Sequence, residues 1–136
     1  MYVFDTDVLS QVLKSSPLPS LIARLAAVPP EQQFTSAITV GEMVYGAWRS
    51  PRREHFLRQL EERVWPNVRV LSFDRSAGET YGRLRAELER SGTPLAEPDL
   101  RIAAIALTND MTLVTGNVRH FARVPGLRVE NWLAPV

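Results

Sequence analysis

The chain has 136 residues, 45% of them hydrophobic, and its formal net charge is +1. This length and hydrophobic fraction fit one domain over residues 1–136 with a buried core. A net charge so close to zero argues against non-specific coating of nucleic acid, so a polyanion would have to be bound by a local patch. The chain has no cysteine, which excludes a disulfide framework, a thiolate nucleophile and a Cys-ligated zinc site.

The start of the chain does not resemble a signal peptide, because strand-like residues and Asp5 follow Met1 at once. The longest alkyl run covers residues 102–107 and is too short to cross a bilayer. We therefore expect a cytoplasmic protein that has no membrane partner.

Helical and strand-like patterns alternate along the chain, which is typical of an α/β domain with a mostly parallel sheet. The first half is predicted to contain, in chain order, a strand over 2–4, helices over 6–14 and 20–28, a strand over 33–37 and a helix over 39–49. The second half is predicted to contain a helix from Pro51 to Val64, a strand over 68–72, a helix over 77–88, a linker over 91–94, a helix over 98–107, a strand over 112–114 and an edge strand over 127–130.

Large apolar side chains crowd two consecutive predicted helices. They are Tyr45, Trp48, Phe56 and Leu60. We interpret at least half of them as core, and the crowding also allows a groove for a partner.

Two carboxylates, Asp5 and Asp7, come directly after the first predicted strand. Open α/β sheets bind their ligands at the carboxyl ends of their strands. Neighbouring acids repel one another unless a cation or a proton neutralises them. This placement indicates a metal site or a phosphoryl-handling site.

Three further polar residues lie at strand-to-helix junctions: Glu42, Asp99 and Asn117. In a parallel sheet with right-handed crossovers such junctions share one edge, so we expect these side chains to converge with Asp5. Three carboxylates and one amide oxygen suit Mg²⁺ or Mn²⁺. Oxygen-only metal sites of this type hydrolyse phosphodiesters through an activated water.

Each of these residues also has a purely structural interpretation. Glu42 can close a capping box on the backbone amide of Thr39, and Asp99 can complement a helix dipole. Asp5 or Asp7 can cap the first helix, although one cap does not need both, and Asn117 can cap a short turn. Taken singly these alternatives stay open, and the joint placement is what favours a site.

Arginine is suited to bidentate phosphate binding. One group that could contact phosphates surrounds a helix boundary, at Arg49, Arg52 and Arg53, and the other, Arg119 with His120, follows Asn117. Solvated surface charge is the commoner role for a single arginine, and only Arg119 is predicted to lie beside the site. His55 and His120 are too isolated in sequence to indicate zinc or a catalytic triad.

Several motifs together resemble PIN-domain proteins, specifically the VapC-type toxins of bacterial type II toxin–antitoxin pairs. The resemblance covers essentially the full length. It is carried by VFDTDVLS at 3–10, TVGEMVYGA at 39–47, DLRIAA at 99–104, LVTGNVRHF at 113–121 and RVPGLRVENW at 123–132.

The resemblance implies a three-layer α/β/α sandwich and a magnesium- or manganese-dependent endoribonuclease that hydrolyses RNA by metal-activated water. It also implies a homodimer and inhibition by a cognate VapB-type antitoxin.

Residue by residue, the resemblance gives Asp5 and Asp99 as direct metal ligands and Glu42 as holding a metal-bound water or a second ion. Asn117 completes the catalytic set. Thr115 and Arg119 are expected to bind the substrate, and Thr115 is also expected to orient a neighbouring carboxylate or water.

The sequence departs from the family pattern at two positions. The family often has asparagine where Asp7 stands, and many PIN domains have aspartate where Asn117 stands. The missing charge at Asn117 weakens the case for a second tightly held metal ion and leaves the one-metal route.

Two alternatives remain. The Asp-x-Asp motif of haloacid-dehalogenase phosphatases also follows a strand, which would make Asp5 a nucleophile. However, Leu9 stands where that motif has Thr or Val, the only lysine is Lys14, and no Asp-Asp pair follows. The second alternative is a non-catalytic module that binds RNA or protein, suggested by the missing charge at Asn117.

Overall fold

The computed structural model describes residues 1–134, and its centre is a five-stranded sheet. The strands are β1 (Tyr2–Phe4), β2 (Gln33–Ser36), β3 (Arg69–Leu71), β4 (Thr112–Val114) and β5 (Val129–Glu130). Their order is β3-β2-β1-β4-β5, and every neighbouring pair is parallel. The predicted parallel sheet is confirmed.

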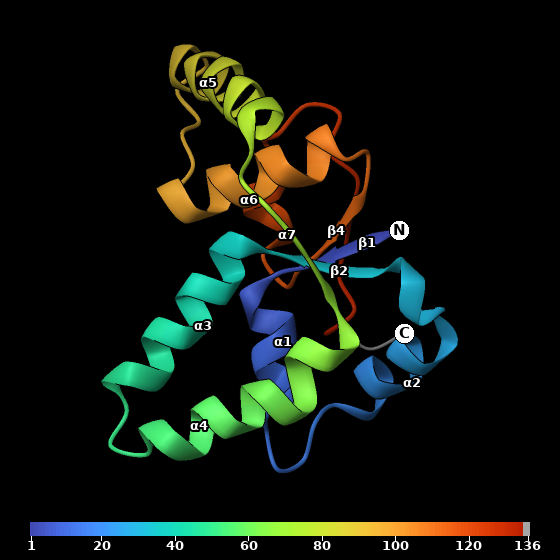
Figure 1. Ribbon diagram of the computed structural model, residues 1–136. Helices are drawn as coiled ribbons and strands as arrows, with labels where there is room; N and C mark the ends of the chain where they lie inside the picture. Colours follow the sequence, from blue (N-terminus) through green and yellow to red (C-terminus); the bar gives the residue numbers. More distant parts are fainter. Residues whose placement is uncertain (135–136) are drawn as a thin grey trace.

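Helices cover both faces of this sheet, with α5 and α6 above it and α1 to α4 below it in the view of Figure 1. They are α1 (Thr6–Val12), α2 (Pro19–Ala27), α3 (Ala37–Arg49), α4 (Arg53–Gln59), α5 (Arg75–Arg90), α6 (Glu97–Thr108) and α7 (Val118–Phe121). A π-helical turn, η2 (Leu60–Val64), extends α4, and short 3₁₀ turns lie at η1 (Pro30–Gln32) and η3 (Trp65–Asn67). Among residues 1–134 no helix has the length and apolar character needed to span a membrane. The three-layer α/β/α sandwich is confirmed.

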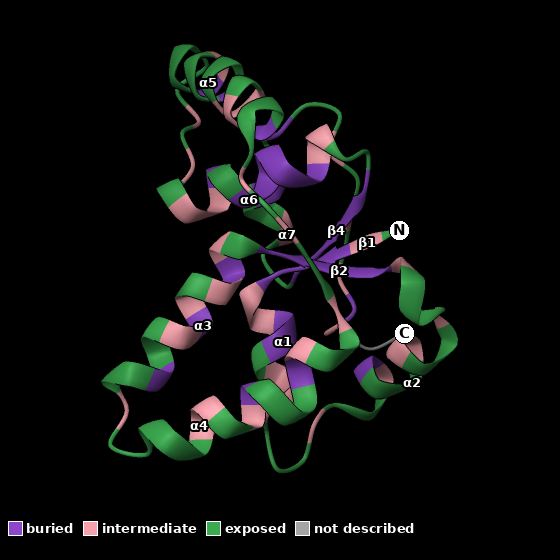
Figure 2. Ribbon diagram, in the orientation of Figure 1, coloured by how far each residue is buried: buried purple, intermediate pink, exposed green. Residues whose placement is uncertain are grey.

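Two hydrophobic cores lie on the two faces of the sheet, whose central strands are mostly buried (Figure 2). Val3 and Leu113 pack on one face with residues of α5, α6 and α7. Phe4 and Val114, the next residue on each strand, pack on the other face with residues of α1, α2, α3 and η2. Because successive strand residues point to opposite faces, three-residue strands are enough to join both layers.

The strand order reverses between β1 and β4, which makes this the topological switch point of the sheet. From β1 the chain continues to β2 and then to β3, whereas β4 and β5 lie on the other side of β1. The helix that follows β1 packs on one face and α7, which follows β4, packs on the other. A crevice at the carboxyl ends of β1 and β4 is the place where such sheets bind ligands.

Helix α3 begins at Ala37, two residues before the predicted start. Its N-cap is Ser36, whose Oγ accepts a hydrogen bond from the backbone N–H of Thr39 at 3.0 Å. The capping box from Thr39 to Glu42 is therefore wrong, because Ser36 already satisfies the amide that Glu42 was expected to bind. This leaves the Glu42 carboxylate available for other contacts.

The four large apolar residues of α3, α4 and η2 divide into two pairs. Leu60 is buried and Phe56 is half-buried. Tyr45 and Trp48 on α3 are 62% and 53% exposed, so they do not belong to the core.

We predict that Ser36→Ala lowers the free energy of unfolding by about 1–2 kcal/mol, because it removes the side-chain cap of α3 and leaves a buried amide without a partner. Urea denaturation checks this value. Ser91→Ala, at an exposed position after α5, is the control and should change stability by less than about 0.5 kcal/mol. Equal effects of both changes would contradict the assigned cap.

Candidate active site

Asp5 lies at the carboxyl end of β1, and hydrogen bonds hold both of its carboxylate oxygens. Oδ1 accepts from the backbone N–H of Thr6 at 2.7 Å, which makes Asp5 the N-cap of α1. Oδ2 accepts from Oγ1 of Thr115 at 2.8 Å. Asp5 is 5% exposed, and burial raises its pKa to about 6, with smaller contributions from the charges of Asp7 and Asp99. Two fixed oxygens on a carboxylate that is costly to ionise are suited to binding a cation.

Thr115 connects the end of β4 to Asp5. Its side chain is fully buried, donates to Asp5 and accepts a hydrogen bond from the backbone N–H of Asn117 at 3.0 Å. A substrate cannot reach a side chain with no exposed surface, so Thr115 can act only on the carboxylate. The side chain of Asn117 is exposed and does not cap α7.

Asp7 packs against the loop that follows β4. Its Oδ2 accepts a hydrogen bond from the backbone N–H of Gly116 at 2.8 Å, and its Oδ1 is buried without a hydrogen-bond partner in residues 1–134. A Cβ added to Gly116 would lie 2.7 Å from Oδ2 of Asp7 and 3.1 Å from Leu133. Gly116 is therefore needed for this close approach.

Glu42 faces the site from the second turn of α3. Its Oε1 accepts a hydrogen bond from Oγ1 of Thr6 at 2.8 Å. This contact joins α3 to the start of α1, next to Asp5. The structure thus places Glu42 beside the residues that follow β1, as the sequence predicted. The direct hydrogen bond, however, comes from Thr6 and not from Asp5 or Asp7.

Asp99 lies in the first turn of α6 and is half-buried. Its pKa is raised, mainly by burial and then by the charge of Glu42, with a smaller contribution from Asp7. His120 has the opposite effect and lowers the pKa of Asp99. Charge interactions therefore connect Asp99 with Glu42 and Asp7, and Asp5 with Asp7 and Asp99.

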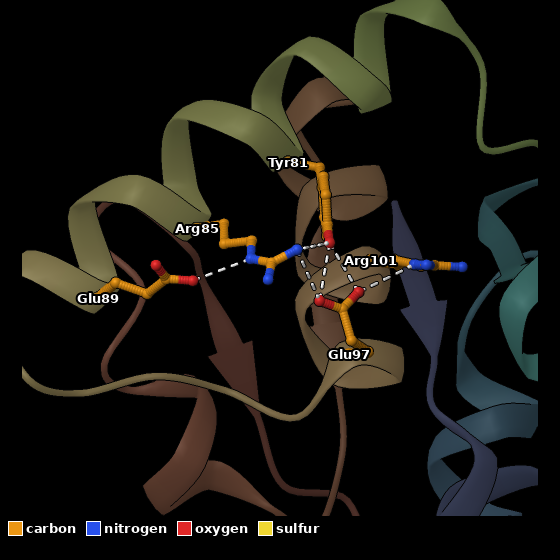
Figure 3. Close-up of polar contacts among 5 residues, drawn as sticks. All are labelled: Tyr81, Arg85, Glu89, Glu97 and Arg101. Carbon is orange, nitrogen blue, oxygen red and sulfur yellow. Dashed lines mark hydrogen bonds and ion pairs between the residues drawn. The ribbon is translucent and has the colours of Figure 1, made fainter.

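The start of α6 is tied to α5 by an exposed polar network (Figure 3). The hydroxyl of Tyr81 hydrogen-bonds to both carboxylate oxygens of Glu97, at 2.8 and 2.7 Å. Arg85 and Arg101 each form an ion pair of 3.3 Å with the same carboxylate. Asp99 lies in the same first turn of α6 as Glu97.

The arrangement fits a hard divalent cation. Within residues 1–134 no group of three or more His, Cys, Asp or Glu side chains is close enough to enclose a metal ion. Mg²⁺, however, keeps several waters and is commonly bound by one or two carboxylates. Asp5 and Asp99, which interact electrostatically, provide such a pair, and the unpartnered Oδ1 of Asp7 adds acceptor capacity nearby.

The remaining predicted residue, Arg119, is exposed on α7 and has no ion pair within residues 1–134. The sequence grouped His120 with Arg119 as a possible phosphate contact but did not predict its place beside Asp99, because a histidine separated from other ligands in sequence carries no motif. One signal could have found it: His120 follows Asn117 by about one helical turn, at the same edge of the sheet.

Two grooves meet at Glu42. The first, which we call the α1/α3/α4 groove, has a volume of about 370 Å³ and is lined mainly by apolar groups, including Leu13, Met43 and Phe56. The second, the α3/α6 groove, has a volume of about 550 Å³ and extends from Glu42 to Tyr45 and Arg101. A ligand in either groove would contact Glu42.

The PIN domain family model matches residues 2–127. The chain is 34% identical to the tRNA(fMet)-specific endonuclease VapC of Salmonella typhimurium, over 96% of this chain and 97% of that protein. It is 33% identical to the ribonuclease VapC2 of Haemophilus influenzae, over 97% and 98% of the two chains.

Solved structures agree with these sequence matches. The structure of DNA-bound VapBC from Salmonella typhimurium contains a chain that superimposes with a TM-score of 0.89 at 34% identity, covering 96% of this chain and 97% of that one. A chain of VapBC2 from Rickettsia felis, bound to a promoter DNA fragment, gives a TM-score of 0.88 at 29% identity, with 96% and 98% covered. The protein therefore belongs to the PIN-domain family and, within it, to the VapC ribonucleases.

Proposed function

We propose that this chain is the toxin of a type II toxin–antitoxin pair and cleaves RNA as a magnesium- or manganese-dependent endoribonuclease in the cytoplasm. The observation that carries this proposal is the set of interacting carboxylates at the switch point of the sheet, with Asp5 fixed at both oxygens. The relatives named as ribonucleases support the same reaction.

Asp5 and Asp99 hold the cation in this proposal. A divalent ion, when bound, supplies the Lewis acidity that stabilises charge on the attacked phosphate. Thr115 keeps Asp5 in position. Thr6 occupies Oε1 of Glu42, and Oε2 would accept a hydrogen bond from a water in the site. Asn117 and Arg119, both exposed at the same edge, contact the RNA on the side of α7.

A VapB-type antitoxin inhibits the enzyme by filling the α1/α3/α4 groove. The apolar lining of this groove suits a protein segment, and a segment bound there would cover Glu42. The similar solved structures of VapBC from Salmonella typhimurium and VapBC-1 from nontypeable Haemophilus influenzae support this type of partner. The active form is a homodimer, as the family resemblance implies.

Two other functions have less support. Membership in the PIN-domain family gives no support to a haloacid-dehalogenase phosphatase. A non-catalytic module would preserve the fold without the reaction, and the first test below separates it from the enzyme.

We predict that Asp5→Asn and Asp99→Asn each reduce metal-dependent RNA cleavage by at least about 100-fold and abolish growth arrest on expression, because each removes a cation ligand. Cleavage of cellular RNA by purified protein with Mn²⁺ measures the effect. Asp110→Asn, at an exposed position of positive φ that asparagine tolerates, is the control. Full cleavage by both active-site variants would reject the assignment.

The raised pKa of Asp5 predicts a pH-dependent stability of the metal-free protein. A carboxyl whose pKa is higher in the folded state contributes stability at low pH that is lost as pH rises through about 6. Relative to Asp5→Asn, the parent should lose up to about 3 kcal/mol between about pH 4 and pH 7. Urea unfolding in EDTA measures this loss, and Mn²⁺ should reverse it near neutral pH. A parallel pH dependence in both proteins would contradict it.

We predict that Gly116→Ala destabilises the protein by about 1–3 kcal/mol, because the new Cβ collides with the Asp7 carboxylate. In an Asp7→Ala background the same change should cost markedly less, since only the flexible end of Leu133 remains close. A double-mutant cycle of unfolding free energies measures the coupling. Additive effects would show that the close approach does not constrain this loop.

A further inference from the structure

One face of α3 carries exposed aromatic rings beside arginines. We call this the aromatic–arginine surface and define it as Tyr45, Trp48, Arg49, Arg53 and Arg101. In Figure 1, α3 extends from the sheet, with α6 near its start and α4 beyond its far end. Tyr45 and Trp48 contribute large exposed rings that no core requires.

The arginines of this surface are held against the rings. The guanidinium of Arg53 lies 4.2 Å from the ring centroid of Trp48 and donates to the Trp48 backbone carbonyl at 3.3 Å. Arg49 lies 5.4 Å from the Tyr45 centroid and donates to its hydroxyl at 3.3 Å. Neither arginine has an ion pair with an acidic residue of the described chain. Their charges are therefore positioned but not neutralised.

The α3/α6 groove links this surface to the acidic site. Glu42 and Tyr45 line it from α3, and Arg101 lines it from α6. Arg101 pairs with Glu97 through Nε, and a terminal nitrogen of its guanidinium lies on the far side from that carboxylate (Figure 3). Arg101 also lies over the rings of Phe73 and Tyr81, at 5.9 and 5.8 Å, which limits its movement.

We propose that the aromatic–arginine surface binds a single-stranded part of the RNA substrate and guides it through the α3/α6 groove to Glu42. Bases stack on Tyr45 and Trp48, and Arg49 and Arg53 neutralise phosphates. Arg101, which is paired with Glu97, donates to the strand only through the terminal nitrogen that faces away from that carboxylate. Exposed rings next to unneutralised arginines are the combination by which proteins hold single strands. This inference rests on the proposed ribonuclease function and names the residues that bind its substrate.

The charge of the surface favours RNA over the two protein partners. A symmetric interface with a second copy would bring the same basic patch onto both subunits, where Arg49 and Arg53 would repel their counterparts. An apolar antitoxin segment has a better match in the α1/α3/α4 groove, which is lined mainly by apolar groups. RNA phosphates neutralise the arginines directly.

Binding of a short fluorescein-labelled oligouridine, measured by anisotropy in EDTA and in the Asp5→Asn background, tests the proposal without cleavage. Tyr45→Ala and Trp48→Ala should each weaken binding roughly 5- to 100-fold, and Tyr45→Phe should keep most of the affinity because it keeps the ring. Arg49→Gln should also flatten the slope of log K against log salt by about 0.7. Arg83→Gln, an exposed change of equal charge on α5, should leave the affinity near that of the parent.

A second pair of variants tests the path of the strand. Gly41 lies in the α3/α6 groove and has no atom within 4 Å of an added Cβ, so Gly41→Leu obstructs the groove without a clash in the protein. It should weaken oligouridine binding at least about 5-fold, the lower end of the loss of one stacked base. Gly82→Leu, at an equally open position on α5, controls for replacing a helical glycine and should bind like the parent.

Several results would overturn the inference. One is no binding by the parent at low salt, and another is parent-like binding by the Tyr45 and Trp48 variants. Gly46 lines the α1/α3/α4 groove and is equally open, so a loss of binding by Gly46→Leu but not by Gly41→Leu would also overturn it. A change of oligomeric mass in the Tyr45 and Trp48 variants, measured by sedimentation, would instead assign the surface to a contact between copies. If binding depends on these residues but the protein with Mn²⁺ cleaves no RNA, the proposed function fails and the binding surface stands.

Discussion

The two hydrogen bonds to the Asp5 carboxylate are the interaction on which the site depends. One comes from the first amide of α1 and the other from the end of β4, so a single carboxylate joins the two strands at the switch point. The backbone adds a third connection, because the N–H of Asp5 donates to the carbonyl of Val114 at 2.9 Å. Burial of this carboxylate opposes its ionisation, and a bound cation removes that penalty. The same residue therefore links the architecture of the sheet to its chemistry.

The three residues that directly follow β1, which are Asp5, Thr6 and Asp7, each contact a different element. Asp5 bonds to the end of β4, Thr6 bonds to α3 through Glu42, and Asp7 bonds to the loop at Gly116. The motif thus organises the surrounding acids as well as contributing two of them. The contact of Asp7 also restricts which residue fits at position 116, because an added Cβ there would collide with the Asp7 carboxylate.

Helix α3 separates two grooves of different character, and Glu42 is common to both. On our proposals, RNA approaches along the aromatic–arginine side and the antitoxin occupies the apolar side. The antitoxin then needs to cover only Glu42, and it does not have to displace the RNA from the whole of the aromatic–arginine surface. The exposed rings of α3 and the buried Asp5 that follows β1 would serve separate steps, binding and cleavage.

The sequence by itself determined the alternation of strands and helices, because apolar runs bounded by turn residues and helical periodicity are local signals. It also predicted that Asp5, Glu42 and Asp99 would converge, since parallel strands end at one edge of a sheet. Only the tertiary structure decided that Thr6 holds Glu42, that His120 lies near Asp99 and that Tyr45 and Trp48 face outward. Helical periodicity shows which residues share a face, but the packing of distant elements decides which face is covered, and that information is not local.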